Sequence, residues 1–228
     1  MNTDIELLDN THSQGIVKTV FAPSAKTAVL YIIVFIITLT VLNRTPDVVA
    51  KYVGPVKAYF SSYIFGLVIT ALIYFTLFFK YERIKSLNKF IPLTLSLLFV
   101  QSLSPPSSGA DLTLSSLLTQ GNIIYFFIMV VIGPFVEEVA FRGCLFGSLC
   151  CLCKSFSGGI IVALLMTSLV FSVMHAQYDS ISAYITEFVF SVILTTIRIN
   201  TKSLIYPVLA HAALNAFAVL SLIVSVVL

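Results

Sequence analysis

Charged residues are scarce in this chain. Only 10% of its 228 residues are Asp, Glu, Lys or Arg, against roughly 25% in an ordinary soluble domain. The 13 basic and 10 acidic residues leave a formal net charge of +3, which is small and dispersed along the chain. The low charge argues against a soluble globular protein and against a nucleic-acid partner.

Tryptophan is absent, yet 58% of the residues are hydrophobic and 19 are phenylalanine. The mean hydropathy is +1.03, and several uncharged runs exceed 14 residues, which is more apolar sequence than one buried core absorbs. A helix needs about 20 residues to cross a bilayer, so the length allows seven or eight crossings and no soluble catalytic domain. We therefore expect an all-α, polytopic transmembrane bundle of about eight helices, a multi-pass protein of the cell membrane.

The cysteines are few and close together. All four lie within ten residues of one apolar stretch, where disulfides that staple loops are not expected: Cys144, Cys150, Cys151 and Cys153. A metal site stays open, but packing as small buried residues is the favoured interpretation.

The N-terminal segment lacks the short basic start of a cleavable signal peptide. Residues 1–26 are polar and carry charges of both signs, so we expect a retained cytoplasmic tail followed by a single transmembrane domain over residues 27–228. The densest basic cluster should also stay in the cytoplasm; it consists of Lys80, Arg83, Lys85 and Lys89.

The pair Gly133-Pro134 interrupts an apolar stretch and predicts either a kink or a turn. A kink gives seven crossings, with ten basic residues inside and three outside, whereas a turn gives eight crossings, with six on each side. The positive-inside rule favours seven. Eight crossings, however, place Glu137 and His175 near the same membrane face, and for that reason we adopt eight. This choice puts positions 85 and 178 on the cytoplasmic side and position 156 on the other.

Ionisable groups at membrane depth are costly, so each is a candidate for function. Arg142 lies one helical turn after Glu138, a spacing that allows an ion pair. Glu137 points about 100° away round the helix and has no local counter-charge. It is therefore the candidate general base, while the Glu138–Arg142 pair is interpreted as structural.

Two further polar pairs have helical spacing. Phe171 lies one turn before His175 at the end of an apolar span, and His211 and Asn215 share one face of the last span. His211 and Asn215 could serve as a pair of hydrogen-bond donors, although Asn215 could equally be polar glue between helices. Glu187 sits within a span and receives no role.

Together these patterns resemble the CPBP family of intramembrane proteases, which comprises CAAX-prenyl endopeptidases and bacteriocin-processing enzymes and is also called Abi. The patterns are Glu-Glu-x-x-x-Arg at 137–142, Phe-x-x-x-His at 171–175 and His-x-x-x-Asn at 211–215, with Phe-Arg-Gly at 141–143 and Thr-Lys-Ser-Leu at 201–204. The resemblance covers residues 130–217. It implies about eight helices around a catalytic cavity open to the cytoplasm. Lys202 replaces the glycine of the family's Thr-Gly-Ser-Leu turn, which puts the shape of the turn in question.

The resemblance also implies roles for individual residues. Glu137 and His175 would activate a water that attacks the scissile amide, and His211 and Asn215 would stabilise the negative oxygen of the tetrahedral intermediate. Glu138 and Arg142 would support the first motif, and Phe171 belongs to the second. No cofactor is expected, because the family is regarded as glutamate-dependent. A zinc site formed by Glu137, His175 and His211 remains a minor alternative.

Two functions of different classes follow. The first is an intramembrane endopeptidase, a hydrolase that cleaves a membrane-associated peptide or protein, most resembling bacterial plasma-membrane members that process bacteriocins or pheromones or confer self-immunity. The alternative is a non-catalytic immunity or scaffold protein that binds a peptide or a sensor kinase. All motif positions are chemically intact, which favours the enzyme. Substrate identity and oligomeric state stay open.

Overall fold

The computed structural model describes residues 24–82, 87–103, 113–155, 157–175 and 180–227. These residues are almost entirely helical, and they contain no strand, so the predicted all-α class is confirmed. Most of the predicted polar tail, residues 1–23, lies outside the described residues, as do Arg83 and Lys85 of the basic cluster.

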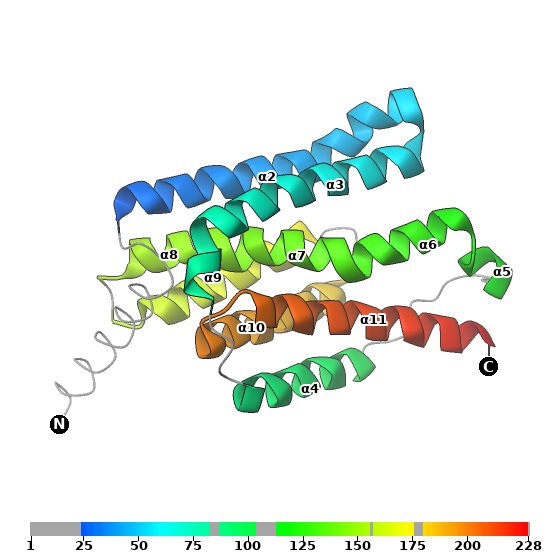
Figure 1. The fold of residues 1–228 in the computed structure, drawn as a ribbon. Helices are drawn as coiled ribbons and strands as arrows, with labels where there is room; N and C mark the ends of the chain where they lie inside the picture. Colours follow the sequence, from blue (N-terminus) through cyan, green and yellow to red (C-terminus); the bar gives the residue numbers. More distant parts are fainter. Residues whose placement is uncertain (1–23, 83–86, 104–112, 156, 176–179, 228) are drawn as a thin grey trace.

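The described part contains seven long helices and one short one (Figure 1). Two sets of segments are continuous, α3 to η2 and α6 to α8, because π-helical or 3-10 stretches join the α-helical ones without a break. In chain order the segments are α2 (Ala25–Val53), α3 (Pro55–Ile73), η1 (Tyr74–Phe78), η2 (Phe79–Tyr81), α4 (Leu87–Leu103), α5 (Leu114–Leu117), α6 (Gln120–Phe127), η3 (Ile128–Ile132), α7 (Gly133–Glu138), η4 (Val139–Leu145), α8 (Phe146–Cys153), α9 (Gly159–Met174), α10 (Ile181–Thr201) and α11 (Ile205–Val227).

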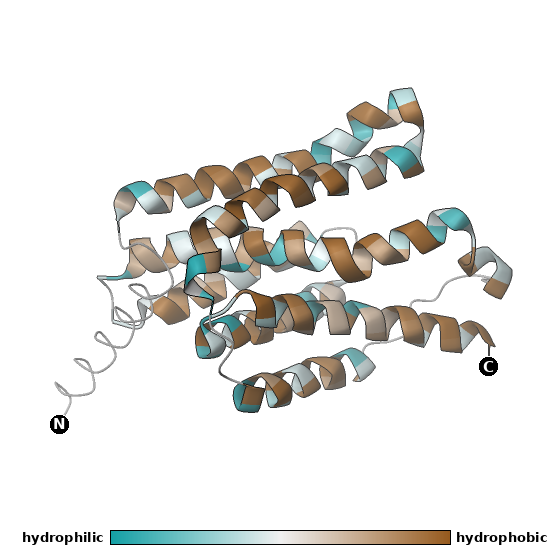
Figure 2. Ribbon diagram, in the orientation of Figure 1, coloured by the Kyte–Doolittle hydropathy of each residue, from teal (hydrophilic) through white to brown (hydrophobic). Residues whose placement is uncertain are grey.

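The protein is a multi-pass membrane protein, as predicted. Within the described ranges, five helices are long and apolar enough to cross a bilayer, namely 25–53, 55–78, 120–153, 181–201 and 205–227, while α4 and α9 are apolar but shorter. Hydrophobic residues cover the long helices along most of their length (Figure 2). Small hydroxyl side chains such as Thr38, Ser62 and Thr167 are fully buried between helices, as expected where helices approach closely in lipid.

The predicted turn at Gly133-Pro134 is wrong. Residues 120–153 form one continuous helix of 34 residues, so the eight-crossing interpretation fails and the chain has seven long helices among the described residues. The π-helical segment η3 ends directly before the pair, and Pro134 occupies the first turn of α7. Because the helix runs without a break from Gln120, Pro134 lies inside it, and the absence of the proline N–H removes one helical hydrogen bond.

Side-chain contacts show which helix ends share a membrane face. The Tyr31 ring, near the start of α2, lies 5.4 Å from the Phe78 ring at the end of η1. Ser148, five residues before the end of the helix that closes with α8, donates a hydrogen bond of 3.0 Å to the carbonyl of Ala28. The start of α2 and the ends of η2 and α8 therefore lie at one face of the bundle, as Figure 1 also shows.

The turn between α10 and α11 lies at the same face, because the Leu204 N–H donates to Glu82 at 2.9 Å. Positions 85, 156 and 178 lie outside the described residues. The predicted separation of positions 85 and 156 therefore stays a prediction. Basic residues gather here, as the positive-inside rule requires of a cytoplasmic face; they include Lys26, Lys80, Lys154 and Lys202.

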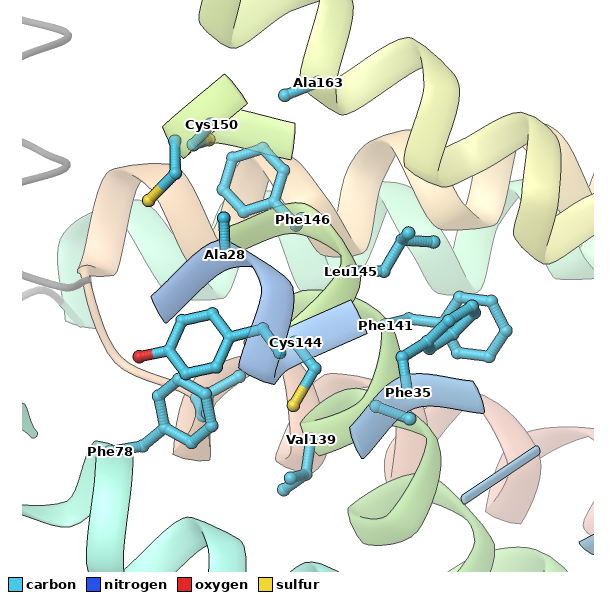
Figure 3. Packing of buried hydrophobic residues seen from close by; sticks show 14 of the residues in the cluster. Ala28, Phe35, Phe78, Val139, Phe141, Cys144, Leu145, Phe146, Cys150 and Ala163 are labelled. Carbon is cyan, nitrogen blue, oxygen red and sulfur yellow. The ribbon is translucent and has the colours of Figure 1, made fainter. Parts of the chain in front are cut away.

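A buried apolar cluster joins α2, η1, η4, α8 and α9 (Figure 3). Phe141 is its centre, because its ring contacts Phe35 at 5.2 Å and Phe171 at 4.9 Å between centroids. Cys144 and Cys150 lie in the same cluster (Figure 3), and all four cysteines are free thiols. The arrangement agrees with packing as the role of the cysteines.

Of the residues that the structure describes, three have positive φ angles, and each lies at a helix end: Gly54, Gly158 and Lys202. Lys202 ends α10 with φ 56° and ψ 23°, the left-handed conformation. The turn therefore keeps the shape that suits glycine, although the residue is lysine.

Candidate functional site

Three helices bring the predicted residues together in the middle of the bundle. The 34-residue helix carries Glu137 and Glu138, His175 directly follows the last residue of α9, and α11 carries His211. The 34-residue helix and α9 form a hairpin with matched arms, because Glu137 lies 16 residues before Cys153 and His175 lies 16 residues after Gly159. A seven-helix chain therefore places Glu137 beside His175, which the sequence argument held to need eight crossings.

Glu138 and Arg142 form the predicted ion pair. The Arg142 Nη1 donates to Glu138 Oε1 at 2.9 Å, and neither side chain has any exposed surface. The Arg142 Nη2 donates to the Ser191 Oγ at 2.8 Å and to the Ser191 carbonyl at 3.3 Å. Sequence reasoning missed Ser191, because a serine within an apolar helix carries no signal that distinguishes a specific partner from ordinary packing.

Glu138 has a second partner that the sequence did not indicate. The same Oε1 lies 2.9 Å from the His211 Nδ1. A carboxylate paired with arginine accepts hydrogen bonds, so Nδ1 of His211 carries the proton in this contact. Glu138 thus fixes the orientation of the His211 ring and directs its Nε2 away from the ion pair, as carboxylates do for histidines in other sites.

Glu137 faces a different set of groups, as predicted. Its side chain is 21% exposed, and its Oε2 lies 4.0 Å from the His175 Nε2 and 4.0 Å from the His211 Nε2. The buried Glu138 and the accessible Glu137, adjacent in sequence, therefore differ in both partners and burial. Glu137 and the two histidines form the one place where a carboxylate and two imidazole nitrogens converge among the described residues.

The backbone sets the tautomer of His175. Its Nδ1 lies 2.8 Å from the Phe171 carbonyl, which can only accept, so this nitrogen bears the proton. In the neutral ring Nε2 then presents a lone pair toward Glu137. A separation of 4.0 Å between Nε2 and Oε2 leaves both acceptors within about 2.8 Å of one water.

Phe171 packs between the histidines and the ion pair. Its ring lies 4.3 Å from the His175 ring and 6.2 Å from the His211 ring, measured between centroids. The guanidinium of Arg142 sits 4.5 Å from the centre of the Phe171 ring. The phenylalanine therefore holds His175 by stacking, accepts its Nδ1–H through the backbone, and covers the cation.

Asn215 has a partner on the backbone. Its Nδ2 donates to the Met129 carbonyl at 2.7 Å. Met129 lies within η3, eight residues before Glu137. The role predicted for Asn215 as an oxyanion donor stays a prediction.

Glu187 lies close to the site without an assigned role. It is partly buried on α10, one turn before Ser191, and within electrostatic range of His175 and His211. In the part of the chain that the structure describes, no three His, Cys, Asp or Glu side chains are arranged to hold a metal ion. Independence from metal stays a prediction.

The part of the chain that carries these residues is similar to known proteins. Residues 119–217 match the family model described as type II CAAX prenyl endopeptidase Rce1-like. The membrane-embedded CAAX protease MroQ of Staphylococcus aureus (strain USA300) is 33% identical over 101 residues, which are 42% of this chain and 38% of the relative. The alignment thus spans well under half of that protein. No solved structure matches the chain.

Proposed function

We propose that this chain, whose residues 119–217 belong to the Rce1-like family of type II CAAX prenyl endopeptidases, is an intramembrane endopeptidase. The resemblance to CPBP proteases is confirmed over these residues, which include all three motifs. The observation that carries the proposal is the convergence of His175 and His211 on Glu137 Oε2, each at 4.0 Å. This arrangement suits a water held for attack on an amide.

Glu137 and His175 act on the water. Each side chain accepts a hydrogen bond from one O–H group of the water, so the water oxygen keeps a lone pair directed toward the scissile carbonyl carbon. As the C–O bond forms, the proton moves to Glu137 and the carbonyl oxygen becomes an oxyanion. Glu137 then returns the proton to the amide nitrogen, the C–N bond breaks, and the products are a carboxylic acid and an amine. This general acid–base step is typically worth 10²- to 10⁴-fold in rate.

His211 stabilises the oxyanion. Its Nδ1–H is held by Glu138 at 2.9 Å, so a proton on Nε2 makes the ring a cationic donor aimed into the space beside Glu137. Donors aimed at charge that appears in the transition state contribute about 10²- to 10³-fold. Arg142 keeps Glu138 in place as an acceptor, and the pair is completely buried.

The substrate is a membrane-associated peptide or protein, because the acting groups lie within a bundle of apolar helices. The name of the relative describes a membrane-embedded CAAX protease. We place this chain with bacterial plasma-membrane enzymes that process bacteriocins or peptide pheromones, or that confer self-immunity. The reaction needs no metal in this proposal, since Glu137 supplies the base.

The test is cleavage of a quenched fluorescent peptide library, carrying an N-terminal acyl chain, by the purified protein in detergent. Glu137→Gln keeps the size of the side chain and removes the proton acceptor, so kcat should fall by at least about 10²-fold. Monodispersity and the thermal unfolding midpoint should not change, because the Glu137 side chain is partly exposed. Substantial turnover by Glu137→Gln would remove the base role. Binding of peptides without cleavage by the wild type would favour the scaffold function.

A further inference from the structure

We propose that Asn215 is a positioning residue that replaces the hydrogen bond lost at Pro134, and that it thereby fixes the helical segment carrying Glu137. The proposal rests on the function proposed above for its effect on catalysis, but the structural part stands independently. It assigns Asn215 to the backbone of the 34-residue helix, and not to the oxyanion.

The backbone of η3 leaves one carbonyl without a helical donor. In an α-helix, the Met129 carbonyl accepts from the N–H of residue 133. Here the Gly133 N–H donates to the Ile128 carbonyl, which gives the wider π-helical turn. The next donor along the chain would belong to Pro134, which has no N–H. Neither residue can therefore satisfy Met129.

Asn215 supplies the missing donor from α11. Its Nδ2 lies 2.7 Å from the Met129 carbonyl, a short and favourable hydrogen bond. A backbone carbonyl left unpaired at membrane depth is costly, because no water is present to satisfy it. The side chain of Asn215 is thus the substitute for a helix hydrogen bond that proline removes.

This contact has consequences for Glu137. α11 holds the 34-residue helix at two points, since Asn215 binds Met129 and His211, one turn earlier on α11, binds Glu138. Gly133 lies directly behind the carboxylate, because a Cβ at this glycine would be 3.7 Å from Glu137 Oε1. Relaxation of η3 toward a regular α-helical register would rotate Glu137 about the helix axis and away from His175.

The two roles considered for Asn215, oxyanion donor and replacement for a helix hydrogen bond, differ in whether a change in the 34-residue helix can compensate for its loss. If Asn215 donates to the oxyanion, its loss cannot be repaired by a change in the 34-residue helix. If it replaces a helix hydrogen bond, Pro134→Ala restores an N–H within reach of η3 and should compensate for Asn215→Ala. A matched control is Pro92→Ala, which changes a proline inside α4, outside the segment that Asn215 contacts.

The experiment measures three properties of Asn215→Ala, Pro134→Ala and the double variant in detergent. These are the thermal unfolding midpoint, amide hydrogen exchange over residues 128–138, and kcat and KM for the acylated peptide. We expect Asn215→Ala to accelerate exchange and to lower kcat by about 10²-fold with little change in KM. The double variant should recover most of both losses, whereas Asn215→Ala with Pro92→Ala should recover neither.

A double variant as impaired as Asn215→Ala in exchange and in kcat would overturn the proposal. Asn215→Asp provides a second probe should the alanine variant not fold, because the carboxylate keeps the shape but repels the Met129 carbonyl. Its defect should also be relieved by Pro134→Ala, and an unrelieved defect would count against the proposal. If the wild type cleaves no peptide, the exchange and unfolding measurements still decide the proposal, so its failure is separable from that of the protease function.

Discussion

Adjacent glutamates have different environments because they lie on different faces of one helix. The Glu138–Arg142 pair was predictable, since its partners are one turn apart in sequence. The other partners were not, because His211 and Ser191 reach this site from α11 and α10. Spacing within a helix reveals local contacts, whereas convergence of helices distant in sequence needs the fold or a family resemblance. The assignment of Glu137 as the candidate base depended both on the spacing within its helix and on the family resemblance.

Replacement of Arg142 should damage folding as well as activity. Arg142→Ala leaves the Glu138 carboxylate buried without its counter-charge, and breaking such a pair costs about 3–5 kcal/mol. We expect a lower yield of monodisperse protein and a lower thermal unfolding midpoint, with loss of cleavage. Glu137→Gln is the matched comparison, with a normal midpoint. Equal midpoints for both variants would contradict the different roles of the two glutamates.

The long helix and the turn after α10 show what local sequence signals decide. Gly133-Pro134 predicts a break on local grounds, but η3 widens the preceding turn, and Asn215 of α11 donates to the Met129 carbonyl there. The break therefore did not form. Lys202 likewise departs from the expected glycine, yet keeps the left-handed conformation, because Glu82 holds the turn by accepting from Ser203 and Leu204. Tertiary contacts override local preference at both places.

Lys202→Gly should stabilise the protein. Lysine in the left-handed conformation is strained, and glycine adopts it without the penalty, a difference of about 1 kcal/mol. Lys202 is exposed, so little packing is lost, and the unfolding midpoint should rise by about 2–4 °C.

The reverse control for this prediction is Gly158→Ala. Gly158 has φ 74°, and a Cβ there would meet nothing within 4 Å, so only the backbone preference changes. Its midpoint should fall. A fall for Lys202→Gly would mean that the lysine side chain makes a stabilising contact that outweighs the strain.

In its described part, the molecule is a bundle of seven long helices and one short one. Lys26, Lys80, Lys154 and Lys202 lie at one face, whereas Lys51 and Lys57 lie at the α2–α3 turn. The positive-inside rule favours seven crossings, and the continuous helix over residues 120–153 agrees with it. Eight crossings were expected only because Glu137 and His175 have to meet. That expectation was wrong because it placed both Glu137 and His175 at helix ends. Glu137 lies within a 34-residue helix, and the hairpin with α9 matches its depth to that of His175. Composition thus predicted the all-α, multi-pass class, but not the depth of the residues.

Cysteine-accessibility labelling tests this topology. In a background without the four native cysteines, cysteines at positions 80 and 154 should react from the same, cytoplasmic side. A cysteine at Tyr52, which lies at the far end of α2 and is 84% exposed, should react from the other side. Labelling of positions 80 and 154 from opposite sides would contradict the continuous helix over residues 120–153.

We propose that Glu137 activates water for peptide hydrolysis without a metal. The most direct measurement is the peptide-cleavage rate of the purified wild type before and after exhaustive treatment with a chelator, with zinc content determined on the same samples and Glu137→Gln as the inactive reference. We predict an unchanged rate in the chelated wild type and a rate at least about 10²-fold lower in Glu137→Gln. Loss of the wild-type rate on chelation, with recovery on adding zinc, would contradict the claim and assign Glu137, His175 and His211 to a zinc site.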